Sequence, residues 1–347
     1  MIKRTPIASR FAEDDARLSP WPGQEASSPL VGRSAEFSRS LRLIERLSTC
    51  DATVLIYGET GTGKELAARA IHYRSARSRG PFIPVNCGAI PDDLMESEFF
   101  GHARGAFTGA HETREGVIGQ AESGSLFLDE VETLSPRGQV ALLRFLQDSR
   151  YRAVGSSAAR NADIRVLVAT NVDLQSLVRA GVFRADLLFR LNVMRLDLPP
   201  LRSRGDDVVL LAAGFIERFS RLYERPPRRL TAGAIDFMLR HPWPGNVREL
   251  ENLIHREILM SDGDEIDLAE ARADAIAPAE AAASGGFAEA KAECIARFER
   301  EYLSNLLHKT GGNISMAARL CGKERSRLTK LLKKHRLDRG SFVARGD

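Results

Sequence analysis

One glycine-rich stretch, Gly58-Glu59-Thr60-Gly61-Thr62-Gly63-Lys64-Glu65, constrains this chain more than any other. The apolar run at residues 53–57 predicts a buried strand, and the apolar spacing of residues 66–72 predicts a helix. Together they form a phosphate cradle, because backbone N–H groups and the helix dipole converge on negative charge while Lys64 reaches the β- and γ-phosphates. A chance glycine-rich turn is the alternative, since Glu65 stands where the general pattern has Ser or Thr. This stretch, the phosphate loop, predicts a nucleotide site.

Length and composition limit the class of protein. A chain of 347 residues accommodates two or three domains, and 43% hydrophobic with 28% charged residues is typical of a soluble globular protein. No apolar run is long enough for a membrane span, and residues 1–10 lack the apolar core of a signal peptide. The four cysteines form no C-x-x-C pair: Cys50, Cys87, Cys294 and Cys321. We therefore expect a cytoplasmic protein with reduced thiols and no cysteine metal site.

The pattern along the chain predicts five parts. Residues 1–29 read as a flexible lead with no room for a sensory module, and strands at 81–85, 124–128 and 164–169 place an α/β region with a parallel sheet at 30–198. A wholly helical region follows at 199–261, with helices at 206–223, 231–240 and 246–260. An Ala-rich linker at 262–286 and a basic, all-α region at 287–347 complete the chain.

Polar side chains end two of the predicted strands. Asp129 and Glu130 follow the apolar residues 126–128, as a P-loop ATPase requires: Asp129 would hold Mg²⁺, and Glu130 would polarise the attacking water. A strand that ends in a solvated turn is the alternative. Asn171 follows the apolar residues 168–169 and could orient the water or sense the γ-phosphate, although Asn also ends strands for turn chemistry alone.

Two arginines, Arg184 and Arg190, stand six residues apart in an apolar-periodic segment. A planar cation aimed at a transferring phosphoryl group accelerates its transfer. Solvated surface arginines are the commoner outcome for such a pair, and composition does not separate the two interpretations.

A second glycine-flanked stretch, Gly105-Ala106-Phe107-Thr108-Gly109-Ala110, has no apolar period. A buried Phe in a tight turn is the ordinary interpretation of such a segment. Its place between the phosphate loop and the acidic strand instead favours a mobile loop, the 105–110 loop, that presents Phe107 and Thr108 to a partner.

The C-terminal region has helix-turn-helix spacing. The pattern predicts a short helix at 313–320, a turn at Cys321-Gly322 and a second helix at 324–335. These elements contain many basic residues and a single acid, Glu324. A solvated basic face is the alternative to double-stranded DNA as a partner. The residues expected at the DNA are Arg325, Ser326, Arg327, Lys330 and Lys334. An apolar pattern at 294–306 suits either a two-fold dimer contact or intradomain core.

Taken together, these motifs closely resemble the bacterial enhancer-binding proteins, the AAA+ activators of RNA polymerase that carries sigma 54. The phosphate loop, the 105–110 loop and residues 126–130, 183–193 and 243–250 carry the resemblance, which runs from about residue 30 to 260. A similar Fis-type helix-turn-helix domain extends it to residue 337. The resemblance implies an AAA+ P-loop sheet with a helical lid, ATP and Mg²⁺ as cofactors, and a subgroup without an N-terminal regulatory domain.

The resemblance also implies roles for residues. Asn86 matches the asparagine that couples the catalytic glutamate to the remodelling loop, Thr170 and Asn171 match the first nucleotide sensor, and Arg248 matches the second. Arg184 and Arg190 match arginine fingers that act across a subunit boundary, so the site would be complete only in a homo-oligomer, from dimer to hexameric ring. The 105–110 loop matches the segment that engages sigma 54 and moves with the nucleotide state.

Three places depart from the family pattern. Ala103 replaces an acid, Glu132-Thr133 replaces a Gly–acid pair, and Ala153 replaces an arginine, which could weaken ATPase coupling or ring assembly. The function implied is binding of upstream DNA and ATP-driven remodelling of the closed sigma 54–polymerase complex, with a separate regulatory protein as a possible partner. A DNA-binding repressor or scaffold that holds ATP as a ligand, and an unfoldase or helicase loader, are the rivals.

Overall fold

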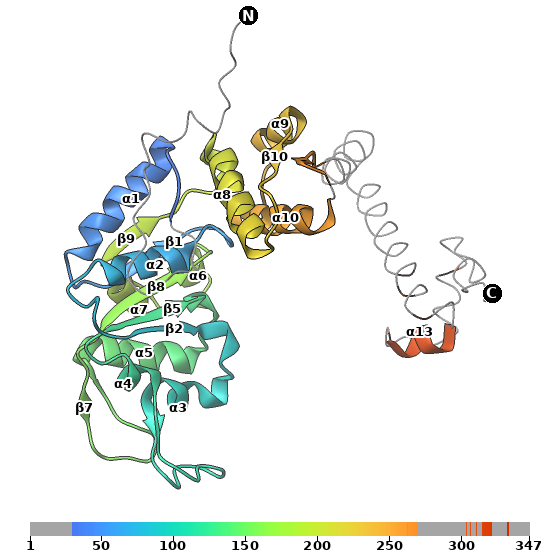
Figure 1. Ribbon diagram of the computed structural model, residues 1–347. Helices are drawn as coiled ribbons and strands as arrows, with labels where there is room; N and C mark the ends of the chain where they lie inside the picture. Colours follow the sequence, from blue (N-terminus) through green and yellow to red (C-terminus); the bar gives the residue numbers. More distant parts are fainter. Residues whose placement is uncertain are drawn as a thin grey trace, which may run out of the picture. The chain divides into compact units, whose positions relative to one another are not determined.

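The structure is a computed structural model that describes residues 30–261, 263–268, 303, 306, 310, 314–320 and 332. The chain divides into two compact units, Met1–Leu268 and Ala269–Asp347 (Figure 1). The predicted lead at 1–29 and the predicted DNA contacts Arg325, Ser326, Arg327, Lys330 and Lys334 lie outside the described residues. Within those residues, no helix is long and apolar enough to cross a membrane.

The first unit is built on a five-stranded sheet with the order β2-β5-β8-β1-β9, in which every pairing is parallel. The strands are β1 (Val54–Tyr57), β2 (Phe82–Asn86), β5 (Ser125–Asp129), β8 (Arg165–Thr170) and β9 (Met194–Asp197). The predicted α/β class is therefore confirmed. The sequence pattern did not predict β9, because only Leu196 of this edge strand is buried and four residues show no clear alternation.

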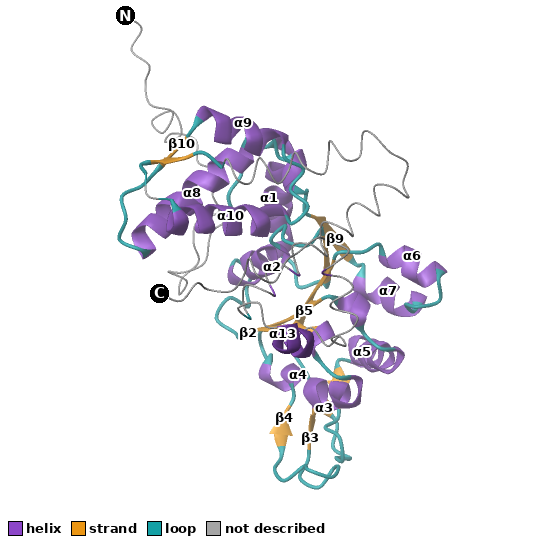
Figure 2. Ribbon diagram, turned by 90° about the vertical axis from the view of Figure 1, so that its right-hand side faces the viewer, coloured by secondary structure: helices purple, strands orange, loops and turns teal. Residues whose placement is uncertain are grey.

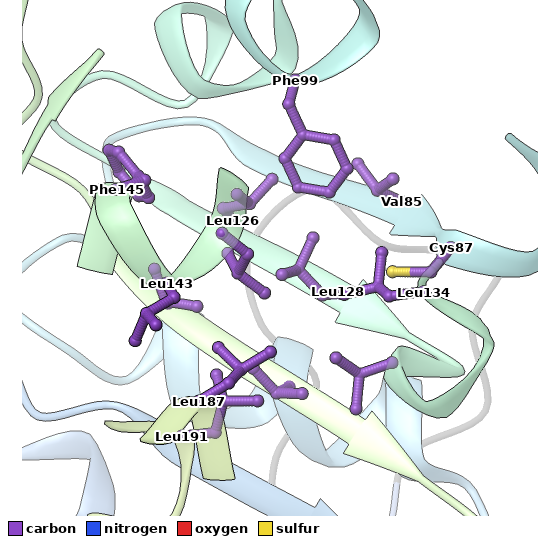
Figure 3. Close-up of a cluster of buried hydrophobic side chains, with 14 of the residues drawn as sticks. Val85, Cys87, Phe99, Leu126, Leu128, Leu134, Leu143, Phe145, Leu187 and Leu191 are labelled. Atoms are coloured by element: carbon purple, nitrogen blue, oxygen red, sulfur yellow. The ribbon is translucent and has the colours of Figure 1, made fainter. Parts of the chain in front are cut away.

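Helices cover both faces of the sheet. Side chains from α1 (Ala35–Ser48) and α2 (Lys64–Tyr73) share one apolar core with β1 and β8. The other core contains side chains of α3 (Met95–Phe100), α4 (Val117–Gln120), α5 (Pro136–Asp148), α6 (Leu174–Arg179) and α7 (Ala185–Leu191). Figure 3 shows Leu126 and Leu128 of β5 among side chains of α3, α5 and α7. Successive strand residues face opposite sides, so the continuous apolar runs fill both cores.

Two short antiparallel hairpins extend from this body. The first pairs β3 (Gly101–His102) with β4 (Arg114–Glu115), and the second pairs β6 (Arg150–Tyr151) with β7 (Arg160–Asn161). Figure 2 shows β3 and β4 projecting away from the sheet below α3 and α4. The hairpins are joined, since the Val154 N–H donates to the Gly101 carbonyl (2.8 Å) and the Ala103 N–H donates to the Val154 carbonyl (2.9 Å).

The lid contains α8 (Asp207–Leu222), α9 (Ala232–Arg240) and α10 (Asn246–Met260), which lie together beside the sheet (Figure 1). It is not wholly helical as predicted, because β10 (Arg229–Leu230) pairs in parallel with β11 (Glu265–Ile266). Ile266 and Leu268 are buried, so residues 263–268 pack on the lid although the sequence pattern assigned them to a linker. Strands of two residues are too short to show a periodicity.

A buried ion pair fixes the lid to the start of the unit. Arg204 donates from Nε to Asp207 Oδ2 (3.1 Å), and both side chains are 3% exposed. Asp207 Oδ1 also accepts the backbone N–H groups of Arg33 (2.6 Å) and Ser34 (3.1 Å). These hydrogen bonds to Asp207 offset the free energy of burying its charge, and they hold the start of α8 beside the start of α1.

The second unit is described in part. It contains α13 (Ile314–Leu320), inside the helix predicted at 313–320. Leu303, Leu306, Ala317, Ala318 and Leu332 are buried together within one chain. This favours intradomain core over a dimer contact for Leu303 and Leu306.

Candidate functional site

The parallel strands bring the predicted polar residues to one edge of the sheet. Asn86 is in register with Asp129, and Tyr57 is in register with Thr170. The Gly58 N–H donates to the Thr170 carbonyl (3.2 Å), which joins the start of the phosphate loop to β8. Because all carboxyl ends of a parallel sheet lie at the same edge, the loop, the acids and the predicted sensor lie together at that edge.

The phosphate loop links β1 to α2. Gly61 and Gly63 have φ values of 79° and 96°, a left-handed conformation that glycine adopts without strain, and Gly63 immediately precedes α2. Buried Thr62 donates its hydroxyl to the Glu59 carbonyl (2.8 Å). The first N–H groups of α2 therefore face the phosphate loop, where a phosphate can accept hydrogen bonds from them.

Lys64 is folded over this loop. Its Nζ donates to the carbonyls of Gly58 (2.8 Å) and Glu59 (3.3 Å). Burial lowers the pKa of the Lys64 ammonium, and the negative charge of Asp129 opposes this shift. A cation held between the loop and an acid is suited to bind a phosphate.

The acids follow β5 directly. Glu130 has a left-handed backbone (φ 55°), and its N–H donates to Asp129 Oδ1 (3.0 Å). A non-glycine residue in this conformation is strained, which is common at functional sites. Burial raises the pKa of the Asp129 carboxyl, so this group sits where an added cation would stabilise its ionised form.

A Mg²⁺ ion fits this arrangement. In the part of the chain that the structure describes, no three His, Cys, Asp or Glu side chains cluster tightly enough to hold a metal ion alone. Mg²⁺ does not need such a cluster, because it usually binds one or two carboxylates together with substrate phosphates. Oε2 of Glu132, a further acid near Lys64, is buried and has no hydrogen-bond partner in the described structure.

Asn86 and Glu130 lie beside Gly88. Asn86 Oδ1 accepts the Gly88 N–H (2.8 Å), and Glu130 Oε2 lies 3.0 Å from the point that a Cβ atom on Gly88 would occupy. Among the described residues, no hydrogen bond joins Asn86 to Glu130 directly. The structure therefore places the two predicted partners close together with Gly88 between them.

The two predicted sensor residues make different contacts. The buried Thr170 hydroxyl bonds within its own turn, to the backbone of Val172 (3.2 and 3.3 Å). Asn171 Nδ2 donates to Thr60 Oγ1 in the phosphate loop (3.1 Å). The Thr170 hydroxyl is thus used within its own turn, whereas Asn171, for which turn chemistry was the alternative, contacts the phosphate loop.

The lid packs directly on the phosphate loop. The Val247 N–H donates to the Gly61 carbonyl (3.0 Å). A Cβ atom on Gly61 would lie 2.2 Å from the Gly245 carbonyl oxygen and 3.1 Å from Cβ of Arg248, whose side chain is exposed. This places the predicted second sensor, Arg248, at the loop.

We expect Gly61→Ala to weaken ATP binding by about tenfold or more, since the left-handed backbone costs about 1–2 kcal/mol and the new methyl group clashes with Gly245. Titration of a fluorescent ATP analogue measures this. The matched control is Gly181→Ala, because Gly181 also has a positive φ (72°) but open space around the Cβ position. Equal affinity losses in both variants would mean that a general loss of stability, and not the contact with the lid, is responsible.

Of the two predicted fingers, Arg184 immediately precedes α7 and Arg190 lies in its last turn; α7 packs on the sheet face opposite α2. Both are exposed, and Arg184 forms an ion pair with Asp186 (2.7 Å). Within the described residues, neither guanidinium is hydrogen-bonded to the phosphate loop. Phe189 between them is 81% exposed, which is unusual for a large apolar side chain.

The 105–110 loop lies at the tip of the first hairpin. Gly105 and Gly109 have φ values of 80° and 106°, and the Gly105 N–H donates to the Ala110 carbonyl (2.8 Å). Phe107 is 41% exposed and its ring packs on His102 in a T-shaped arrangement, with 5.0 Å between the ring centroids. Thr108 is exposed. The buried-aromatic interpretation does not hold.

Comparison with known proteins decides the family. The family models Sigma-54 interaction domain, AAA+ ATPase lid domain, and Bacterial regulatory protein, Fis family match residues 30–197, 202–284 and 295–335. The transcriptional regulatory protein ZraR of Klebsiella oxytoca is 42% identical over 315 residues, which cover 90% of this chain and 71% of ZraR. This chain belongs to the sigma-54-dependent enhancer-binding proteins. GlrR of Escherichia coli K12 is 39% identical over 333 residues, covering 95% of this chain and 74% of GlrR.

Other relatives agree. The phenol regulator MopR of Acinetobacter guillouiae is 41% identical over 315 residues, and the chain spans 56% of the length of MopR. The crystal structure of NtrX from Brucella abortus in complex with ATP has a TM-score of 0.67 at 32% identity, over 90% of this chain and 70% of NtrX. Its complex with ADP has a TM-score of 0.65 at 32% identity, over 88% and 68%.

Within this enhancer-binding protein, two of the departures from the family pattern adjoin each other. Ala103 bonds to Val154, the residue after Ala153, so both lie where the two hairpins join. Glu132 instead lies among the acids near Lys64. Two of the three departures therefore lie at the shared base of the hairpins, and their effect on ATPase coupling or ring assembly stays a prediction.

Two residues of the site were missed from the sequence. Arg202 donates both arms of its guanidinium to Glu59 (2.7 and 2.5 Å), and Asn246 donates to Glu59 and Thr60 (3.1 and 3.0 Å). Asn246 is part of the 243–250 motif, in which only Arg248 was assigned a role. Arg202 carried no signal, because it stands among arginines that lead into the lid.

Proposed function

We propose that this protein is a sigma-54-dependent transcriptional activator of the cytoplasm. It binds upstream double-stranded DNA, forms a homo-oligomeric ATPase ring and remodels the closed RNA polymerase–sigma 54 complex to open the promoter. The observation that carries the proposal is the presence, on one α/β unit, of a phosphate loop with its acids and of the exposed 105–110 loop.

ATP with Mg²⁺ is the proposed fuel. Support comes from the loop geometry around Lys64, from the lid contact at Gly61, and from NtrX, whose structures hold ATP and ADP. Asp129 would hold Mg²⁺, which offsets the charge that develops on the phosphates, and Glu130 would orient and polarise the attacking water.

The arginines of α7 would complete a neighbour's site. Arg184 just before α7 and Arg190 in its last turn are exposed, as is Phe189, and neither arginine bonds to the phosphate loop of its own chain. An apolar side chain between two cations suits a contact with a second copy whose nucleotide accepts the arginines. Each site would therefore be complete only in the assembled ring.

The path from hydrolysis to the polymerase follows the chain. The segment after Asn86 passes Gly88, next to Glu130, and continues through α3 to β3 at the base of the 105–110 loop. Loss of the γ-phosphate would change the surroundings of Glu130, and the shift would reach the loop through this segment. Phe107 and Thr108 would contact sigma 54.

The DNA-binding role is proposed for the Fis-type region. The proposed contacts are Arg325, Ser326, Arg327, Lys330 and Lys334. Arg and Lys in a second helix after a turn would contact phosphates and base edges in the major groove.

Opening of a supercoiled sigma 54 promoter tests the proposal. We expect the purified chain, with sigma 54 polymerase and ATP, to make the start site reactive to permanganate, which modifies unpaired thymines. ADP in place of ATP is the control and should leave the start site unreactive. ATP hydrolysis without opening would contradict the proposal and favour a repressor or scaffold.

A further inference from the structure

We infer that Arg202 and Asn246 are positioning residues of the ATPase site, which tie the phosphate loop to the lid through Glu59 and Thr60 and so set how long a nucleotide stays bound. The inference rests on the proposed function, because it requires that the loop bind ATP. It concerns the two residues that the sequence pattern left without a role.

Glu59 is the side chain that receives the tie. Arg202 lies in the turn Leu201–Ser203 between the sheet and α8, and its Nη1 and Nη2 donate to Oε2 (2.7 Å) and Oε1 (2.5 Å) of Glu59. Such a two-armed pair fixes two planar groups in one orientation, which a single hydrogen bond does not. The second residue of the phosphate loop is therefore held by the first turn of the lid region.

Asn246 adds a buried bridge. Its Nδ2 donates to Glu59 Oε2 (3.1 Å) and to the Thr60 carbonyl (3.0 Å), while its Oδ1 accepts the Leu201 N–H (2.8 Å). The residue is fully buried and has a φ of 53°. Asn suits this position, since it tolerates a left-handed backbone and carries donors and an acceptor on one short group.

The ion pair with Arg202 also balances the negative charge of Glu59 in the phosphate loop. The hydrogen bond from Arg202 lowers the pKa of Glu59 to about 2, so this carboxylate is ionised at neutral pH. An unpaired carboxylate in a phosphate-binding loop would repel the nucleotide. Arg202 supplies the positive charge that pairs with Glu59.

The consequence is mechanical. Three successive loop residues are hydrogen-bonded to the lid region. Glu59 accepts through its side chain, and Thr60 and Gly61 accept through their backbone carbonyls. Parting of the lid from the sheet, which releases a nucleotide in many enzymes, must break these bonds together. The tie therefore slows release, while in the described structure neither Arg202 nor Asn246 is itself hydrogen-bonded to Lys64 or Glu130.

Stopped-flow release of a fluorescent ATP analogue tests the inference. We expect Asn246→Ala to speed release by about tenfold, because it leaves buried groups unpaired. Arg202→Gln should speed release by about threefold to fivefold, since its pair with Glu59 is half-exposed and screened. KM should rise in parallel, while kcat changes by less than about twofold because the reacting groups stay in place.

A double-mutant cycle separates a tie from a general loss of stability. In a Glu59→Gln background, Arg202→Gln should have almost no additional effect, whereas Arg202→Lys in the wild-type background should restore part of the slow release. The matched control is Arg221→Gln, which breaks an exposed ion pair with Glu217 on α8 (2.9 Å). Within the described structure this pair has no hydrogen bond to the phosphate loop, so the variant should leave release unchanged.

Two results would overturn the inference. One is unchanged release in both variants, measured well below their melting temperatures, with only the melting temperature lowered. The other is additive effects of Glu59→Gln and Arg202→Gln. If Asn246→Ala fails to fold, the release rate of Arg202→Gln tests the inference alone, because Arg202 is exposed. A wild-type chain that does not bind the analogue would instead overturn the proposed function, and the inference with it.

Discussion

Glu130→Gln should slow ATP hydrolysis by about 10³-fold while ATP binding is retained, because a general base contributes roughly 10²–10⁴-fold. The side chain keeps its size and its place beside Gly88, and the left-handed backbone tolerates Gln no worse than Glu. The amide cannot accept a proton from the attacking water. Phosphate release under saturating ATP measures the rate, and titration with a fluorescent ATP analogue measures binding.

The control for this variant is Glu217→Gln, which removes an exposed acid from α8 and should leave the rate unchanged. Loss of nucleotide binding in Glu130→Gln would show that the acid supports the loop and not the reaction. A rate within tenfold of wild type would mean that another group orients the water. Glu132, whose Oε2 is buried without a partner in the described structure, would then be the next acid to replace.

The sheet and the edge that carries the candidate nucleotide site could be predicted, because polar residues directly follow the apolar runs that form the strands. The runs before Gly58, Asp129 and Thr170 are continuously apolar, and a buried parallel strand is the structure that such runs form. Polar residues directly after them must lie at the carboxyl edge. This positions the phosphate loop, the acids and the sensor strand together, although the roles of the individual residues stay predictions.

The remainder depends on contacts between distant segments, which no local pattern records. Arg202 reaches Glu59 across 143 positions, and Asn246 reaches it across 187. The two-residue strands β10 and β11 exist only because they pair with each other. Thr170 ends a strand as a sensor residue would, yet its hydroxyl bonds within its own turn.

The joined hairpins give the departures at Ala103 and Ala153 a shared physical meaning. The 105–110 loop does not stand alone, because β3 is bonded to Val154 on the second hairpin. A Cβ atom on Gly155 would lie 2.7 Å from Cβ of Ala106, so the two loops also touch. Small residues at this junction permit the close approach, and a movement of either hairpin must move the other.

Thr108→Ala should abolish promoter opening, a loss of about 30-fold or more, because removal of a central contact in an interface costs roughly 2 kcal/mol or more. The Thr108 side chain is exposed on the 105–110 loop and has no hydrogen bond to any described residue, so its loss leaves the fold and the nucleotide edge intact. ATP hydrolysis should stay within about twofold of wild type. Permanganate reactivity of the start site and phosphate release are measured on the same samples.

The conservative variant Thr108→Ser gives the matched comparison, since it keeps the hydroxyl and removes only a methyl group. If the hydroxyl makes the contact with sigma 54, Thr108→Ser opens the promoter and Thr108→Ala does not. If the methyl group matters, both variants fail while both hydrolyse ATP. Opening by Thr108→Ala at the wild-type level would show that the Thr108 side chain is not needed for the contact with the polymerase. The exposed Phe107, which rests on His102 beside the junction of the hairpins, would then have to carry the contact alone.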